Sequence, residues 1–223
     1  MPTLYIVATP IGNLNDLTLR AIETLKEVDL VLAEDTRVAR KILNHLGLQR
    51  PAWRADEYAA ESFYKRVADF LDEGKSAAFV SDAGTPGIAD PGAKLVAYLR
   101  ERHPEISIIP IPGPSAIATL LSVSGIHANE FTFVGYPPHK KGRATFFKKL
   151  CKIIIRPIVL YESPHRLQKT FESIKKTFGA DQRLIVGKEL TKLHEEVWHG
   201  TVREAQEYFK GEKGRGEFTM VIK

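Results

Sequence analysis

Short apolar runs alternate with amphipathic stretches through the first half of the chain, and this alternation constrains the fold more than any other feature. The runs are rich in β-branched residues and predict strands at 5–8, 30–33, 77–81 and 106–111. The stretches between them predict helices at 17–27, 37–46, 61–73 and 91–102. Strands that alternate with helices in this way favour a parallel, doubly wound sheet that is covered on both faces.

The pattern changes after residues 112–114, which read Pro-Gly-Pro. Longer gaps then separate the apolar runs, which predict strands at 131–135, 158–161, 184–187, 196–199 and 218–222. The late strands are short, and this favours antiparallel pairing within a mixed sheet. We therefore predict an α/β protein of two domains, residues 1–114 and residues 115–223.

Three helix starts carry recognisable end signals. Asp90 and Ser163 each stand before a proline, which is the order of an N-cap residue and the first helical position. Thr201 and Glu204 have the spacing of a capping box and predict the start of the last helix.

Basic residues are concentrated in the second half. Residues 1–111 hold 13 Lys and Arg against 16 Asp and Glu, whereas residues 112–223 hold 19 against 11. The stretch 137–156 contains basic residues and no acidic one. A basic patch is typical of a polyanion partner such as nucleic acid, but a solvated lysine-rich helix would have the same composition.

Composition disfavours several classes of protein. Cys151 is the single cysteine, and the sequence has no CxxC or HxxxH pattern, so we expect no disulfide and no dedicated metal site. Apolar runs are too short to span a membrane, and the first residues lack the basic region of a signal peptide. We therefore expect a cytoplasmic protein without a membrane partner.

Four loops rich in glycine and proline follow the predicted parallel strands, at 8–14, 34–37, 81–92 and 112–116. Ligands of open α/β sheets bind beyond the carboxyl ends of the strands, so these loops predict a ligand site, although glycine and proline also mark ordinary turns. GxGxxG, the P-loop and GxSxG are all missing, which disfavours common dinucleotide, NTP-hydrolysing and serine-hydrolase sites. The residues alone thus indicate a two-part α/β protein with a ligand site at the strand ends.

At these loops the chain resembles the tetrapyrrole-methylase superfamily. The resemblance is carried, in order, by ATPIGNLNDLTLRA, AEDTR, SDAGTPGIADPG, PGPSA, FVGY, YESPHR and KELTKLHEEVWHG. It implies two α/β domains with S-adenosylmethionine in the cleft between them, usually in a homodimer. SDAGTP and YESPHR are more narrowly similar to the branch that methylates the ribose 2′-hydroxyl of a cytidine in 16S rRNA, so 16S rRNA or the small ribosomal subunit is the expected partner.

The resemblance also implies the cofactor contacts. They are Pro10, Ile11, Gly84, Thr85, Ile88, Ser115, Ala116, Tyr161, Leu190 and Thr219. Relatives often have an acidic residue at the position of Thr85, and similar full-length enzymes generally continue beyond the position of Lys223 into a helical extension. An enzyme of the same family that acts on a small molecule or a protein, or a non-catalytic ribosome-binding protein, remains an alternative.

Charged residues at strand ends are the candidates for catalysis. Glu162 and Arg166 form the leading pair, with Asp35 and Glu189 at other strand ends, although each is equally compatible with a structural salt bridge. The segment 137–143 is expected to be a mobile basic loop that contacts phosphates. The predicted RNA-binding residues are Arg37, Lys140, Lys141, Arg143 and Lys148.

Overall fold

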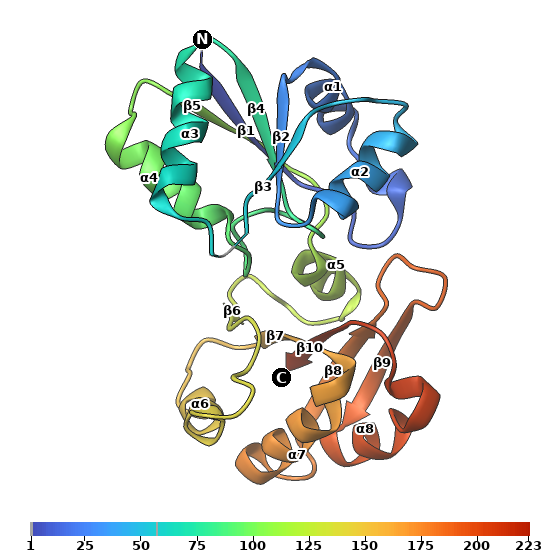
Figure 1. The fold of residues 1–223 in the computed structure, drawn as a ribbon. Coiled ribbons are helices and arrows are strands. Elements are labelled where there is room, and N and C mark those ends of the chain that lie inside the picture. The colour runs from blue at the N-terminus through green and yellow to red at the C-terminus, as the bar shows by residue number, and fades with distance from the viewer. Residues whose placement is uncertain (1, 57) are drawn as a thin grey trace. The chain divides into compact units, whose positions relative to one another are not determined.

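The computed structural model describes residues 2–56 and 58–223 (Figure 1). The chain divides into two compact units, Met1–Ser115 and Ala116–Lys223. Within the described ranges, every helix is too short or too polar to cross a membrane.

The first unit is built on a five-stranded parallel sheet. Its strands are β1 (Thr3–Val7), β2 (Leu30–Ala33), β3 (Ala52–Arg54), β4 (Ser76–Val80) and β5 (Ser107–Ile111). Their order is β3-β2-β4-β1-β5, and every pair is parallel, which confirms the predicted doubly wound sheet. The periodicity did not predict β3, because Ala-Trp-Arg is short, lies at the edge and has no β-branched residue.

Four helices cover the two faces of this sheet. They are α1 (Leu19–Glu27), α2 (Thr36–His45), α3 (Glu61–Asp72) and α4 (Gly92–Arg102). Figure 1 shows α1 and α2 on one face and α3 and α4 on the other. Alternate residues of β2 divide accordingly, since Val31 packs with α1 and α2 whereas Leu30 and Leu32 pack with α3 and α4. All three are buried, which explains why the strand is apolar throughout.

The helix starts of the first unit differ slightly from the prediction. A 3₁₀ turn (Leu14–Asp16) precedes α1, whose N-cap Thr18 accepts a hydrogen bond from the Ala21 amide. The helix predicted from residue 91 begins at Gly92, and the carboxylate of Asp90 accepts the Gly92 amide at 3.0 Å. Asp90 therefore lies one residue before the N-cap position, which Pro91 occupies, and not at the N-cap as predicted.

The second unit contains a mixed sheet, as predicted. Its strands are β6 (Thr132–Phe133), β7 (Ile158–Glu162), β8 (Arg183–Lys188), β9 (Glu196–Thr201) and β10 (Phe218–Ile222). Their order is β6-β7-β10-β8-β9. Among the described strand pairs of this second sheet, β6–β7 is parallel and the other three are antiparallel. β6 is shorter than the predicted strand 131–135.

Helices also cover this second sheet. They are α5 (Ala116–Val123), α6 (Arg143–Leu150), α7 (Leu167–Phe178) and α8 (Val202–Tyr208). The last three pack on one face with the core residues of β7, β8 and β10. α5 packs on the opposite face, where a Cβ at Gly187 would meet Leu120 at 2.9 Å. The capping box of Thr201 and Glu204 is present, and Ser163 precedes a 3₁₀ turn (Pro164–Arg166) that leads into α7.

Candidate functional site

Three of the predicted ligand loops meet at the carboxyl edge of the parallel sheet. Thr9, which follows β1, exchanges backbone hydrogen bonds with Gly84, which follows β4, at 2.9 and 3.1 Å. The buried hydroxyl of Thr9 also donates to the carbonyl of Ser81 at 3.0 Å. The backbone of Ala8 pairs with Ile111 at 3.0 Å, which brings in the end of β5. These bonds give the loops after β1, β4 and β5 one fixed arrangement.

Two glycines allow the close approach of these loops. Gly84 has φ +83°, and a Cβ there would lie 3.4 Å from Ile11 and 3.6 Å from the Pro114 carbonyl. A Cβ at Gly113 would lie 2.9 Å from that of Ala8, closer than real side chains come. Glycine is therefore favoured at Gly84 by its positive φ and at Gly113 by the lack of room for a side chain, and both glycines let the loops pack closely.

Thr85 holds the loops together by its side chain. Its hydroxyl donates to the carbonyl of Pro114 at 3.2 Å, so it links the segment after β4 to the segment after β5. Pro10, Ile11 and Ser115 lie in the same three loops, and Ile88 is partly exposed beyond Thr85. The structure thus places the cofactor contacts predicted for the first unit in these three loops. At Thr85, where relatives often have an acidic side chain, it shows a hydroxyl that positions the loop after β5.

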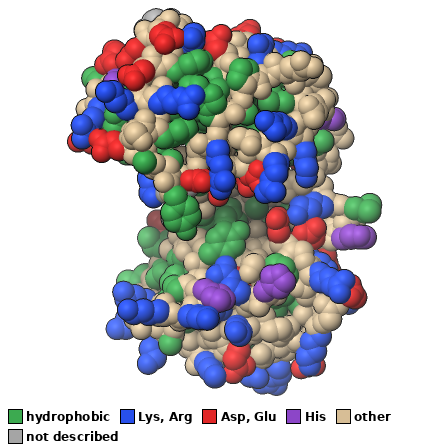
Figure 2. Space-filling view, in the orientation of Figure 1, with side chains coloured by type: hydrophobic (Ala, Val, Ile, Leu, Met, Phe, Trp, Pro, Cys, Tyr) green, Lys and Arg blue, Asp and Glu red, His purple; other side chains and the backbone are tan. Residues whose placement is uncertain are grey.

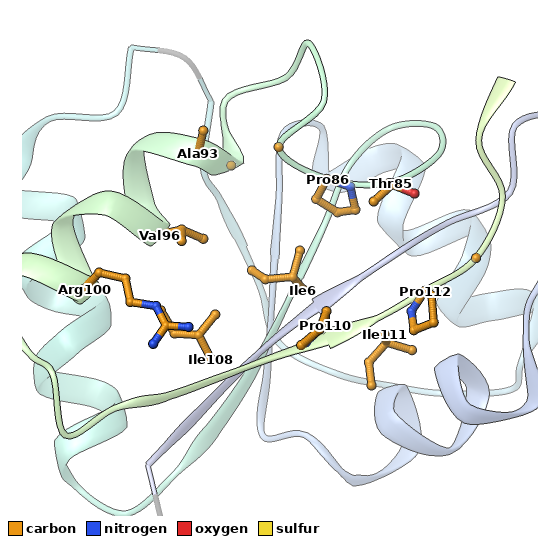
Figure 3. Close-up of a pocket in the computed structure, with 13 residues that line it drawn as sticks. Ile6, Thr85, Pro86, Ala93, Val96, Arg100, Ile108, Pro110, Ile111 and Pro112 are labelled. Carbon is orange, nitrogen blue, oxygen red and sulfur yellow. The ribbon is translucent and has the colours of Figure 1, made fainter. Parts of the chain in front are cut away.

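An apolar cavity of about 540 Å³ extends from these loops along α4 and β5. Figure 3 shows Val96 and Arg100 of α4 facing Ile6 and Ile108 of the sheet, with Thr85 at one end. Among the predicted cofactor contacts, only Thr85 lines it. The cavity is therefore a feature of the α4 face, and the loop geometry rather than this cavity defines the candidate ligand site.

The loop after β2 forms a second, polar cavity at the same sheet edge. The carboxylate of Asp35 accepts the Arg37 guanidinium at 2.6 to 3.0 Å, and its backbone amide donates to Asp82 at 3.1 Å. The hydrogen bonds from Arg37 lower the pKa of Asp35 to about 2. Burial raises the pKa of Asp82. Arg37 is 85% exposed, so the pair faces solvent.

In the second unit, three predicted cofactor contacts lie side by side. Thr219 of β10 pairs with Tyr161 of β7 on one side and with Gly187 of β8 on the other. Leu190 packs over Gly187, where a Cβ would meet it at 3.1 Å. Burial raises the pKa of Tyr161 to about 12, so its hydroxyl stays neutral. Ala116, the first residue of α5, belongs to the same unit.

Glu162 and Arg166 meet inside a buried charge cluster, which we call the Glu162 cluster and which also contains Arg143 and Thr170. The carboxylate of Glu162 has no exposed surface and lies 2.7 Å from Nε of Arg166 and 3.8 Å from Arg143. It also accepts the Ser163 amide at 2.8 Å and the hydroxyl of Thr170. Burial lowers the pKa of Arg143, although Glu162 acts in the opposite direction. Both carboxylate oxygens of Glu162 thus have partners within the protein.

Glu189 follows β8 in a strained turn. It has φ +48° and Thr191 has φ +67°, and residues other than glycine rarely adopt this backbone conformation. Its carboxylate accepts the Glu217 amide at 2.8 Å and the Lys192 ammonium at 3.0 Å. Burial alone would raise its pKa, but these hydrogen bonds leave the pKa of Glu189 lowered. The turn fixes the backbone that presents Leu190.

The predicted RNA-binding residues fall into two environments. Lys140, Lys141 and Lys148 are exposed, and Figure 2 shows Lys and Arg side chains gathered over the part of the second unit where α6 lies in Figure 1. Arg143 is only 12% exposed because its guanidinium belongs to the Glu162 cluster. Arg37 lies on the first unit, beside Asp35.

Sequence reasoning did not identify Thr9, Asp82 or Thr170. Each is a short polar side chain that bonds to a partner distant in the sequence, which for Thr170 is Arg143. Thr9 and Asp82 stand within the quoted motifs, but nothing in those motifs shows that the Thr9 hydroxyl is buried or that Asp82 accepts the Asp35 amide. Thr170 lies in the middle of α7, where its type gives no signal.

Comparison with known proteins assigns the chain to one family. The model of the tetrapyrrole (corrin/porphyrin) methylases matches residues 3–206. The chain belongs to this family, which confirms the predicted family. Membership makes it a methyltransferase, for which S-adenosylmethionine is the methyl donor.

Similar proteins carry a more specific name. One from Thermotoga maritima, called ribosomal RNA small subunit methyltransferase I, is 43% identical over all of this chain and 98% of its own length. One of the same name from Synechocystis sp. is also 43% identical, over all of this chain and 79% of its own length.

Solved structures support the fold. A cobalt precorrin-4 methyltransferase superposes with a TM-score of 0.75 at 16% identity, over 99% of this chain and 94% of its own. Uroporphyrin-III-C-methyltransferase from Thermus thermophilus gives 0.70 at 19% identity, with the same coverage of both chains. At these identities the likeness concerns the fold alone, and it confirms the predicted fold class.

Proposed function

We propose that this chain transfers the methyl group of S-adenosylmethionine to the ribose 2′-hydroxyl of a cytidine in 16S rRNA. The observation that carries the proposal is the 43% identity, over the whole chain, to a protein named ribosomal RNA small subunit methyltransferase I. The exposed lysines beside α6 supply the positive charge that an RNA substrate requires. We also propose action in the cytoplasm, on the small ribosomal subunit or its rRNA, and a homodimer.

The residues of the first unit fit the cofactor. The loops after β1, β4 and β5 are fixed by the Thr9–Gly84 and Thr85–Pro114 hydrogen bonds, and glycine lets them pack closely at Gly84 and Gly113. Backbone amides and carbonyls in such a cradle can bind the carboxylate, amine and ribose oxygens of a ligand. Pro10, Ile11, Gly84, Thr85, Ile88 and Ser115 are the proposed contacts in this unit, with Ala116, Tyr161, Leu190 and Thr219 in the second unit.

Positioning is the main task of the protein in this reaction. When bound, S-adenosylmethionine supplies a methyl group that its positive sulfur has already activated. With the cofactor bound, the fixed loops would set its position relative to the acceptor hydroxyl, and such alignment accounts for much of the barrier reduction in group transfer.

The four carboxylate and guanidinium groups predicted for catalysis are suited to this positioning role. Glu162 and Arg166 bind each other in a buried cluster, and Glu189 is held by Lys192 and the Glu217 amide. Asp35 is ionised at neutral pH but is a weak base, because Arg37 lowers its pKa to about 2. We propose that these groups hold backbone and substrate and that the hydroxyl proton leaves to solvent.

The proposal is tested with small ribosomal subunits from cells that lack the corresponding methyltransferase. The purified protein is incubated with radiolabelled S-adenosylmethionine and either these subunits, naked 16S rRNA or large subunits as the control. Nuclease digestion then locates the label. The proposal expects label on the 2′-oxygen of one cytidine of 16S rRNA and none on the large subunit.

Two results would contradict the proposal. Label on a base or a ribosomal protein would keep the enzyme class but change the acceptor. Tight cofactor binding by calorimetry without any label in rRNA would turn attention to small-molecule or protein substrates of the same family.

A further inference from the structure

The basic loop, which we define as residues 137–142, is held at its beginning by two arginines that lie later in the chain. Arg166 donates to the Pro137 carbonyl at 3.2 Å, and Arg143 donates to the Pro138 carbonyl at 3.1 Å. Arg143 is also the residue that follows the loop and begins α6. Its side chain therefore turns back and fastens the end of the loop to its beginning.

Both arginines are held in turn by one carboxylate. Glu162 lies 2.7 Å from Nε of Arg166 and 3.8 Å from Arg143. Arg143 also donates to the Thr170 hydroxyl, which donates to Glu162, so a second path joins them. The Glu162 side chain is fully buried, and a buried guanidinium is stable only beside such a partner. Removing the Glu162 carboxylate would therefore deprive both Arg143 and Arg166 of their charged partner.

The middle of the loop carries the charge that an RNA backbone would meet. Lys140 and Lys141 are exposed, as are the neighbouring His139 and Gly142. Gly142 has φ +84°, which turns the chain into α6. The two ammonium groups thus lie on a short segment whose beginning is hydrogen-bonded to Arg143 and Arg166. Fixing a binding segment beforehand reduces the entropy lost on binding.

We propose that Glu162 is a positioning residue for RNA recognition, which acts through Arg143 and Arg166 to hold the basic loop in the conformation that contacts rRNA phosphates. This inference rests on the proposed function and assigns to the Glu of the YESPHR motif a task other than proton transfer. Lysine binds phosphate as a point charge, so its contribution depends on where the backbone places it.

The first experiment compares wild type with Glu162→Gln, which keeps the shape of the side chain and removes its charge. We expect the KM for small ribosomal subunits to rise about tenfold, with kcat and cofactor affinity changed less than about twofold. Limited trypsin digestion, followed by mass spectrometry, should show cleavage after Lys140 and Lys141 about tenfold faster. Glu172→Gln is the matched control, because Glu172 lies on α7 and pairs with Lys176 at the surface.

A double-mutant cycle separates this role from a general structural one. Lys140 and Lys141 are both changed to Ala, with and without Glu162→Gln. If Glu162 acts through the loop, the substitution has no further effect on KM once the two lysines are gone. A tenfold effect that persists in the lysine-free background would overturn the proposal, as would unchanged KM and trypsin cleavage in Glu162→Gln itself.

Two further results keep the test decisive. If Glu162→Gln does not fold, Arg143→Lys and Arg166→Lys take its place, since each keeps the charge and loses the guanidinium fork that bonds a loop carbonyl and the Glu162 cluster at once. If wild type methylates no rRNA, the proposed function fails, but the trypsin measurement still reports whether Glu162 fixes the loop. Equal cleavage rates at Lys140 and Lys141 in wild type and variants would then reject the positioning role.

Discussion

The ends of β2 and β7 each carry a carboxylate that pairs with an arginine, and the surroundings of these two pairs differ. Asp35, after β2 of the first unit, pairs with an Arg37 that is 85% exposed. Glu162, at the end of β7 of the second unit, pairs with Arg166 and Arg143 and has no exposed side-chain surface. The same residue types in similar sequence positions therefore form a solvated pair in one unit and a buried cluster in the other.

The difference reflects how each unit holds the loops at its strand ends in place. In the first unit the loops are fixed by backbone bonds and by two close-packed glycines, so the charges around Asp35 are free to face a substrate. In the second unit buried side-chain charges fix the loop after β6, so Glu162 cannot be exchanged for a neutral residue without cost. Chemical type alone does not distinguish these roles, whereas burial does.

The largest expected effect is the difference in stability between two variants, each of which neutralises one of the two carboxylates. We expect Glu162→Gln to lower the free energy of unfolding by about 3 kcal/mol, because two mostly buried guanidinium groups lose their charged partner. Asp35→Asn should change it by too little to separate from zero, since exposed ion pairs contribute little. Denaturant unfolding of both variants measures the difference. Equal losses would break the comparison between the two strand ends.

The next effect concerns the glycines of the first unit. Gly84→Ala and Gly74→Ala place a side chain at nearly the same φ, +83° and +82°, so each should lose about 1 kcal/mol of stability. Only Gly84 stands against Ile11 and the Pro114 carbonyl, whereas Gly74 has open space around it. Calorimetry should therefore show cofactor affinity reduced roughly tenfold in Gly84→Ala alone. A similar reduction in Gly74→Ala would show that stability, and not the cradle, controls binding.

A smaller effect is expected for the salt dependence of RNA binding. Changing Lys140 and Lys141 to Ala should reduce the slope of log affinity against log salt concentration by about 2, since each lysine neutralises one phosphate in the wild-type complex. The control changes Lys210 and Lys213, which lie beyond α8 and are also exposed. Filter-binding titrations at several salt concentrations measure both slopes. An identical decrease in the control pair would argue for a diffuse charge effect.

The smallest effect is expected at Asp82. Burial raises the pKa of Asp82, so its ionised form is less favourable in the folded than in the unfolded chain. Asp82→Asn keeps an acceptor for the Asp35 amide and removes this charge, so it should slightly stabilise the protein at pH 7. The gain should disappear as the pH falls below about 4, where aspartate is protonated in the unfolded chain as well. Thermal unfolding at the two pH values checks the sign, and a variant less stable at pH 7 would contradict it.

The sequence predicts the parallel sheet well because its strands are buried on both faces. Leu30–Ala33 is apolar throughout, and its predicted ends are the observed ones, whereas β3 and β6 are short edge strands with weak patterns. The motifs indicate which loops form the candidate site. They do not reveal the burial of Glu162, because Arg143 and Thr170 come from other elements and only the folded unit brings them together.

The central claim is that this chain methylates a cytidine ribose in 16S rRNA, and complementation tests it most directly. The chain is expressed in cells that lack the corresponding methyltransferase, and 2′-O-methylation of their 16S rRNA is mapped by mass spectrometry. The account predicts that one 2′-O-methylcytidine reappears. Expression of folded, cofactor-binding protein with no restored ribose methylation would contradict it.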